Sequence, residues 1–196
     1  MVKLPDNYPL VPPKVTFIQH TGDRIHPNLY TEGKVCLSIL GTWPGDPWSY
    51  SMTVESVLIT IRSLLDNKPY MHEPHQGDNP QFNAFVRHNS WRWLLLDYLD
   101  REEDAQAKDF LQQYLRNHGD NMIKELENQK LDNAGTKALT SPYKRGSSTK
   151  PDYEALLRDL KWHVSQNSGH VLGQSPKAPQ PPEGDQNKRS AACDDQ

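Results

Sequence analysis

The most regular helical pattern of this sequence comes directly after a stretch that no helix or strand can cross. Residues 41–47 contain two glycines and two prolines, so they must form a loop. Beyond the loop, apolar side chains recur at spacings of three and four residues and so share one helix face; they are Val54, Val57, Leu58, Ile61, Leu64 and Leu65. Ser51 or Thr53 can cap the start of this helix, and Pro69 limits its end. The sequence therefore predicts a helix over about 54–65.

Before the loop, the pattern favours extended structure. Residues 15–18 (V-T-F-I) are β-branched or aromatic and predict a strand, and the prolines at 9, 12 and 13 suit an extended edge or loop before it. A short apolar run follows at 35–40, after a turn at Glu32 and Gly33.

Further helices are expected in the second half of the chain. Over residues 82–99, the apolar side chains are spread over nearly all faces of a helix, which predicts a well-buried helix. A third helix contains residues 110–115 and extends beyond Gly119, and a fourth carries Tyr153 and three leucines behind Pro151. The polar stretch 132–150 is interpreted as a linker or surface loop, and residues beyond 165 as a disordered tail.

Composition excludes several classes of function. A formal charge of −3 gives no broad attraction to nucleic acid or anionic membranes, and the longest apolar run has only four residues, at 93–96. No signal peptide is recognisable at the N-terminus. The two cysteines, Cys36 and Cys193, make no disulfide framework, and the aspartates after Cys193 exclude a prenylation signal. We expect a soluble protein of the cytoplasm and the nucleus, with no nucleic-acid or membrane partner.

Residues 25–48 hold the side chains most suited to chemistry. Cys36 lies between a turn and a short apolar segment. In this position it can be either a nucleophile or a small core residue. Asn28, eight residues earlier, brings an amide that can stabilise an oxyanion, whereas His26 precedes a proline and suits a structural hydrogen bond more than general-base catalysis. The side chains that could bind a metal are His20, His26, Cys36, His72 and His75. Their spacing in the sequence matches no zinc pattern. We therefore expect no metal, and no other cofactor is expected.

These segments together resemble the ubiquitin-conjugating enzyme family. They are Y-P-L-V-P-P at 8–13, H-P-N at 26–28, G-K-V-C-L-S-I-L at 33–40, Trp48, and the helix that ends in V-L-I-T-I-R-S-L-L at 57–65. The inserted G-T-W-P-G-D-P at 41–47 and later segments, such as P-D-Y-E-A-L-L-R-D-L, resemble the large type Z members with a helical C-terminal extension. The resemblance covers roughly residues 4–164 and weakens after residue 90.

The resemblance implies roles for individual residues. Cys36 matches the cysteine that accepts ubiquitin or a ubiquitin-like protein as a thioester from an activating enzyme and passes it to a substrate lysine, usually with a ligase. Asn28 matches an asparagine that is either an oxyanion donor or a brace for the site. His26, Pro27 and Trp48 match structural positions, and Glu73 aligns, after a one-residue gap, with an acidic residue that orients the incoming lysine; a solvated glutamate is the alternative.

Ligase docking in the family uses two loops. Their matches here are Leu10 and the segment Ser49-Tyr50-Ser51, in which Tyr50 replaces the family's proline. Leu10 and Tyr50 are otherwise simply exposed apolar residues. Trp43 remains free to contact a partner. The partners that the resemblance implies are the modifier, an activating enzyme, a ligase and protein substrates.

The fold expected from the resemblance is α+β. It is a conjugating core of antiparallel sheet and helices over residues 1–100, lacking its N-terminal helix and first strands, followed by a helical extension over 101–164 and a disordered tail over 165–196. The rival interpretation is a non-catalytic binding module, or an inactive fragment, that keeps the cysteine without being charged.

Overall fold

The computed structural model describes residues 1–19, 21–143 and 148–167. Its elements are β1 (Val2–Lys3), β2 (Lys14–Val15), the 3-10 turn η1 (Ser38–Leu40), α1 (Val54–Leu64), the 3-10 turn η2 (Pro69–His72), α2 (Pro80–Ser90), the π-helical segment η3 (Trp91–Leu96), α3 (Asp97–Arg101), α4 (Ala105–Asp132), β3 (Leu139–Thr140), β4 (Ser148–Thr149) and α5 (Tyr153–Asn167). Helices and two small antiparallel sheets make the fold α+β, as expected. The division into domains at residues 100 and 164 stays a prediction.

The strand predicted over residues 15–18 is present only at its first residue. β2 pairs antiparallel with β1, with Val15 opposite Val2, and the ladder then stops. The chain stays extended because its amides find single partners instead: Thr16 N–H donates to Met1 O and Phe17 N–H to Gly33 O, each at 2.9 Å. The N-terminal region is therefore built from turns and isolated bonds rather than from a broad sheet.

Helix α1 confirms the prediction for residues 54–65 within one residue. Thr53 is the cap: its hydroxyl accepts from Ser56 N–H, and the Ser56 hydroxyl accepts from Thr53 N–H in return. Val57 packs into a small core with residues that surround the cysteine segment; they are Leu29, Val35, Leu37 and Ile39. Leu58 and Leu65 of the predicted apolar face are exposed.

The helix predicted over 82–99 is one continuous run of α2, η3 and α3. Asn79 caps its start, since its side-chain oxygen accepts from Phe82 N–H at 3.0 Å. The prediction of burial all round is wrong at Leu94 and Tyr98, which are exposed. The π-helical segment rotates the helix faces, so that the Trp91 indole N–H reaches the Gln129 side-chain oxygen at 2.9 Å.

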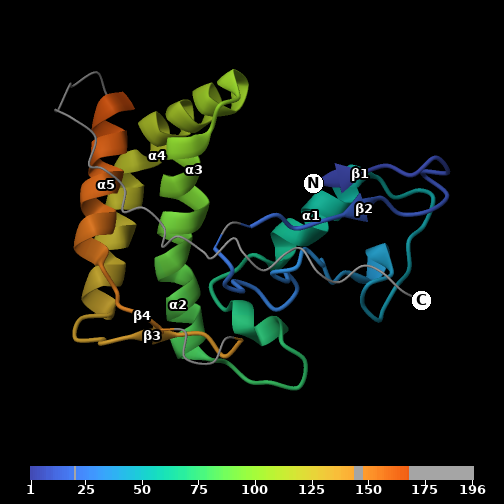
Figure 1. The fold of residues 1–196 in the computed structure, drawn as a ribbon, viewed down its shortest axis with the longest axis horizontal. Helices are drawn as coiled ribbons and strands as arrows, with labels where there is room; N and C mark the ends of the chain where they lie inside the picture. Colours follow the sequence, from blue (N-terminus) through green and yellow to red (C-terminus); the bar gives the residue numbers. More distant parts are fainter. Residues whose placement is uncertain (20, 144–147, 168–196) are drawn as a thin grey trace, which may run out of the picture.

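Helix α4 continues through Gly119, as predicted, and lies beside α5 in Figure 1. A second core fills the space between η3, α4 and α5, and its fully buried members are Leu96, Leu115, Leu126 and Leu160. The two long helices approach closely at Gly119, where an added Cβ would meet Val164 Cγ2 at 2.6 Å. In Figure 1 these helices gather on one side of the molecule and α1 with β1 and β2 on the other.

The interpretation of residues 132–150 as a linker or surface loop is wrong in part. β3 pairs with β4 antiparallel, and Leu139 is buried against the aromatic residues of α2, Phe82 and Phe85. Leu139 is the only large aliphatic residue of this stretch and so has no periodic partner, which is why sequence patterning does not reveal it.

The fourth predicted helix is α5, and it begins at Tyr153 behind Asp152. The Asp152 carboxylate accepts from Ala155 N–H at 2.9 Å. The helix includes residues 165–167, which the sequence placed in the tail. The rest of the predicted tail, with Cys193, lies outside the described residues. No helix in the described part of the chain is long and apolar enough to cross a bilayer.

Candidate functional site

The turn at residues 26–28 is held by the ring of His26. Its Nε2 lies 3.0 Å from Leu64 O at the end of α1, and its Nδ1 accepts from Asn28 N–H at 3.0 Å. These two bonds require a neutral ring with its proton on Nε2. Burial lowers the pKa of His26 to about 4, which keeps the ring neutral at physiological pH. The geometry is that of the structural hydrogen bonds anticipated for this residue.

Asn28 and Cys36 are joined by two reciprocal hydrogen bonds. Cys36 N–H donates to Asn28 O at 2.9 Å, and the Asn28 side-chain amide donates to Cys36 O at 2.8 Å. The side-chain oxygen of Asn28 is buried and has no hydrogen-bond partner among the residues that the structure describes. The eight-residue spacing in the sequence thus closes a turn that places the asparagine amide beside the cysteine backbone.

The Cys36 thiol is buried, with 1% of the residue exposed, and it is in no disulfide with another described residue. Such burial is typical of a small core cysteine. Any reaction at the sulfur with a macromolecular partner therefore requires the surrounding loop to open locally.

The hydroxyl of Thr42 organises the segment that follows Cys36. It accepts from Leu37 N–H at 2.9 Å and lies 2.6 Å from Val35 O, to which it donates. One side chain thus satisfies backbone groups on both sides of the cysteine. The indole of Trp43, the next residue, is exposed.

Glu73 is in contact with a residue far away in the sequence. The Tyr143 hydroxyl, in the segment after β3, donates to Glu73 Oε2. The structure also places Arg24 next to Tyr143 and to the 26–28 turn. Sequence reasoning missed Tyr143 and Arg24, because neither belongs to a motif and 70 residues separate Tyr143 from Glu73.

The histidines considered as metal ligands do not form a cluster in the part of the chain that the structure describes. The rings of His26 and His72 lie 5.1 Å apart, but His26 uses both nitrogens in hydrogen bonds and His72 Nε2 pairs with Asp66 at 2.9 Å. No group of three or more metal-ligating side chains is found among the described residues. His20 lies outside them.

The two predicted docking loops lie side by side. The Trp48 indole N–H donates to Pro9 O at 2.7 Å, which joins the segment of Leu10 to that of Ser49 and Tyr50. Leu10 and Tyr50 are 75% and 76% exposed, while Ser49 is half-buried. The arrangement presents two apolar side chains to solvent on adjacent loops.

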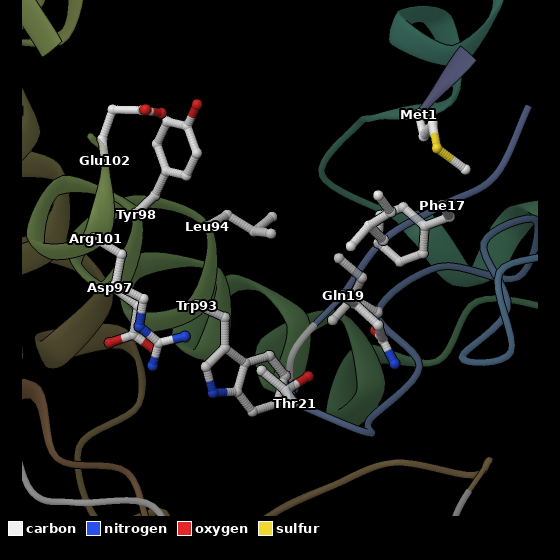
Figure 2. A pocket seen from close by; sticks show the side chains of 12 residues that line it. Met1, Phe17, Gln19, Thr21, Trp93, Leu94, Asp97, Tyr98, Arg101 and Glu102 are labelled. Atoms are coloured by element: carbon white, nitrogen blue, oxygen red, sulfur yellow. The ribbon is translucent and has the colours of Figure 1, made fainter. Parts of the chain in front are cut away.

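A cavity of about 620 Å³ lies away from Cys36, between the extended segment near Phe17 and the helices η3 and α3. In Figure 2, Trp93 and Leu94 face Phe17 and Gln19 across it, while Asp97 and Arg101 lie along the same helical side. It contains none of the residues predicted for the site.

Comparison with known proteins identifies similar sequences. The model of the family described as "Ubiquitin-conjugating enzyme" matches residues 1–87. Similar curated proteins include ubiquitin-conjugating enzyme E2 Z of Danio rerio, 43% identical over 51% of this chain and 33% of the relative, and that of Homo sapiens, 38% identical over 57% and 36%. A putative ubiquitin-conjugating enzyme E2 38 of Arabidopsis thaliana is 48% identical over 39% of this chain and 24% of its own length. The matched region thus spans about a third or less of these three relatives.

Proposed function

We propose that this chain is a transferase that carries ubiquitin or a ubiquitin-like protein on Cys36, because the model of the ubiquitin-conjugating enzyme family matches residues 1–87. The observation that carries the proposal is the pair of hydrogen bonds between Asn28 and Cys36, which sets an asparagine amide against the backbone of the cysteine. The bonds lie inside the matched segment.

Charging exchanges one thioester for another. The Cys36 thiolate attacks the carbonyl carbon of the thioester that an activating enzyme holds; the activating enzyme's sulfur leaves and takes up the proton that Cys36 lost. The bond broken and the bond formed are of one kind, so no oxidant and no strong base are needed. Since the thiol is buried, the loop must open before this step.

In transfer to a substrate, a lysine amine attacks the same carbonyl carbon: an amide bond forms, the bond to the Cys36 sulfur breaks, and the sulfur leaves as a thiolate that takes up the proton lost by the amine. The amine must lose its proton, and Glu73 is the carboxylate that we assign to orient it. We assign Asn28 the role of a brace, because its amide is already bonded to Cys36 O, where it fixes the segment. Service as an oxyanion donor would require this amide to break that bond first.

Partners follow from the same proposal. A ligase docks on Leu10 and Tyr50, whose exposed side chains lie on loops joined by the bond from Trp48 to Pro9, with Ser49 between them. An activating enzyme, protein substrates and a location in the cytoplasm and the nucleus complete the proposal.

The burial of Cys36 favours a second candidate function. A cysteine that is 1% exposed can be a core residue, and the domain would then bind a partner without carrying a modifier. The two functions differ in one observable, the thioester.

The test is a charging reaction with the full chain, ATP, activating enzymes, and ubiquitin or ubiquitin-like proteins, read on non-reducing gels. We expect an adduct that a thiol reductant removes, present in the unmodified chain and in Cys193→Ser but absent in Cys36→Ala. A chain that is folded by circular dichroism and forms no adduct would refute the transferase and support the binding module.

A further inference from the structure

A residue of the C-terminal half reaches into the surroundings of the candidate site. Tyr143 follows β3, and its ring packs edge-on against Phe82 of α2, with ring centres 5.2 Å apart. Its hydroxyl donates to Glu73 Oε2. The ring is thus anchored in the aromatic core while its polar end meets the carboxylate.

The same ring covers Arg24. The Arg24 guanidinium carbon lies 4.3 Å from the centre of the Tyr143 ring and 3.6 Å from that of Tyr30, so the cation is flanked by two aromatic rings. Arg24 Nε donates to His26 O at 3.2 Å, and Nη2 donates to Pro27 O. Tyr143 therefore touches both the carboxylate and the cation that holds the 26–28 turn.

The phenol can act only as a donor to this carboxylate. Burial is the main cause that raises the pKa of Tyr143 above its ordinary value of 10.0, and the hydrogen bond to Glu73 is the second cause. The hydroxyl therefore stays protonated, holds Oε2 and leaves the second carboxylate oxygen of Glu73 for another partner.

We propose that Tyr143 is a positioning residue that fixes the Glu73 carboxylate for the incoming substrate amine, so that the C-terminal extension takes part in the transfer step. This inference rests on the proposed function. It predicts a role in transfer to lysine and none in the charging of Cys36, since the polar contact of Tyr143 is with Glu73 and its ring contacts found among the described residues do not include the cysteine.

The test uses the full chain, charged with modifier and then freed of activating enzyme, and compares two nucleophiles. Lysine needs a carboxylate to orient and deprotonate it, whereas hydroxylamine is small and uncharged at neutral pH. We expect Tyr143→Phe to slow discharge to lysine roughly fivefold and to leave discharge to hydroxylamine unchanged. Phenylalanine keeps the ring over Arg24 and against Phe82, so the variant removes the hydroxyl alone.

Glu73→Gln provides the matched control. It should slow lysine discharge at least as much as Tyr143→Phe, and adding Tyr143→Phe to it should cause no further loss, because the hydroxyl acts through that carboxylate. Equal slowing with both nucleophiles, unchanged lysine discharge, or full additivity of the two variants would overturn the role of Tyr143. An unmodified chain that never charges refutes the proposed function instead, and this inference falls with it.

Discussion

The turn around Cys36 and the core between α4 and α5 both contain buried side chains, but different interactions hold the two regions. In the turn, side chains satisfy backbone groups: Asn28 bonds Cys36 O and Thr42 bonds Val35 O and Leu37 N–H. In the bundle, most backbone groups bond within their own helices, and a cluster of apolar side chains fills the space between the helices. The comparison teaches that equally buried side chains can be held in place by hydrogen bonds in one region and by apolar packing in another.

One buried histidine lies in the turn and another contacts the start of α5, and the two rings hold their protons on different nitrogen atoms. His26 carries its proton on Nε2, toward Leu64 O, and accepts at Nδ1 from Asn28 N–H. His88 of α2 accepts at Nε2 from Asp152 N–H at 3.0 Å, so its proton is on Nδ1. Burial lowers the pKa of both rings. Each ring joins segments distant in sequence, one in the turn and one at the start of α5.

The largest expected effect tests the apolar side of the comparison. Leu126→Ala removes a fully buried side chain from the bundle core and should lower the free energy of unfolding by about 4 kcal/mol. Urea unfolding measures it, with Leu10→Ala as the control at an exposed position, where no comparable loss is expected. A loss no larger than that of the control would show that the bundle is not held by packing.

The next effect tests the polar side through pH. The pKa of His26 is about 4 in the folded chain against 6.5 ordinarily, so on acidification the unfolded state takes up the proton first. The contribution of His26 is fully present above pH 6.5 and is lost between 6.5 and 4, by about 3 kcal/mol in total.

Urea unfolding at several pH values measures that loss, and NMR of the His26 ring separates it from His88 and His163, whose lowered pKa values act in the same direction. A His26 ring that titrates near its ordinary value would contradict the prediction.

A smaller effect is expected at Thr42. Thr42→Val keeps the shape of the side chain but leaves Leu37 N–H and Val35 O without their partner, which should cost about 2 kcal/mol. Thr42→Ser keeps the hydroxyl and should stay near the unmodified chain in thermal unfolding. Equal losses in both variants would mean that the methyl group, and not the hydroxyl, stabilises the loop.

The smallest effect has a sign that depends on the neighbour. In most helices glycine to alanine is stabilising by about 1 kcal/mol, but at Gly119 the new Cβ would meet Val164, so overpacking should leave Gly119→Ala destabilised by about 1 kcal/mol. In a Val164→Ala background the same change should stabilise. The free energies of unfolding of the unmodified chain, the two single variants and the double variant form a double-mutant cycle. If Gly119→Ala has the same sign of effect in both backgrounds, the close approach of the helices is disproved.

The sequence predicts what is periodic or local. Helix α1 follows from spacing, Thr53 is one of the two caps that the sequence offers, and the bonds between Asn28 and Cys36 agree with a motif of fixed length. Contacts made by isolated residues do not follow: Leu139 lies in a polar stretch, and Tyr143 finds Glu73 only because β3 packs on α2. The chemical roles of Cys36, Asn28 and Glu73 stay predictions, since geometry shows contacts and not turnover.

The burial of Cys36 makes its reactivity a measure of motion. A cysteine residue that is 1% exposed reacts with a small alkylating reagent from opened conformations, so the observed rate is the intrinsic thiol rate multiplied by the open population. Each 1.4 kcal/mol of opening free energy slows the reaction about tenfold. The same closed loop slows unwanted oxidation of the sulfur and sets an upper limit on the rate of every reaction there, so protection and speed at this cysteine are opposite consequences of one equilibrium.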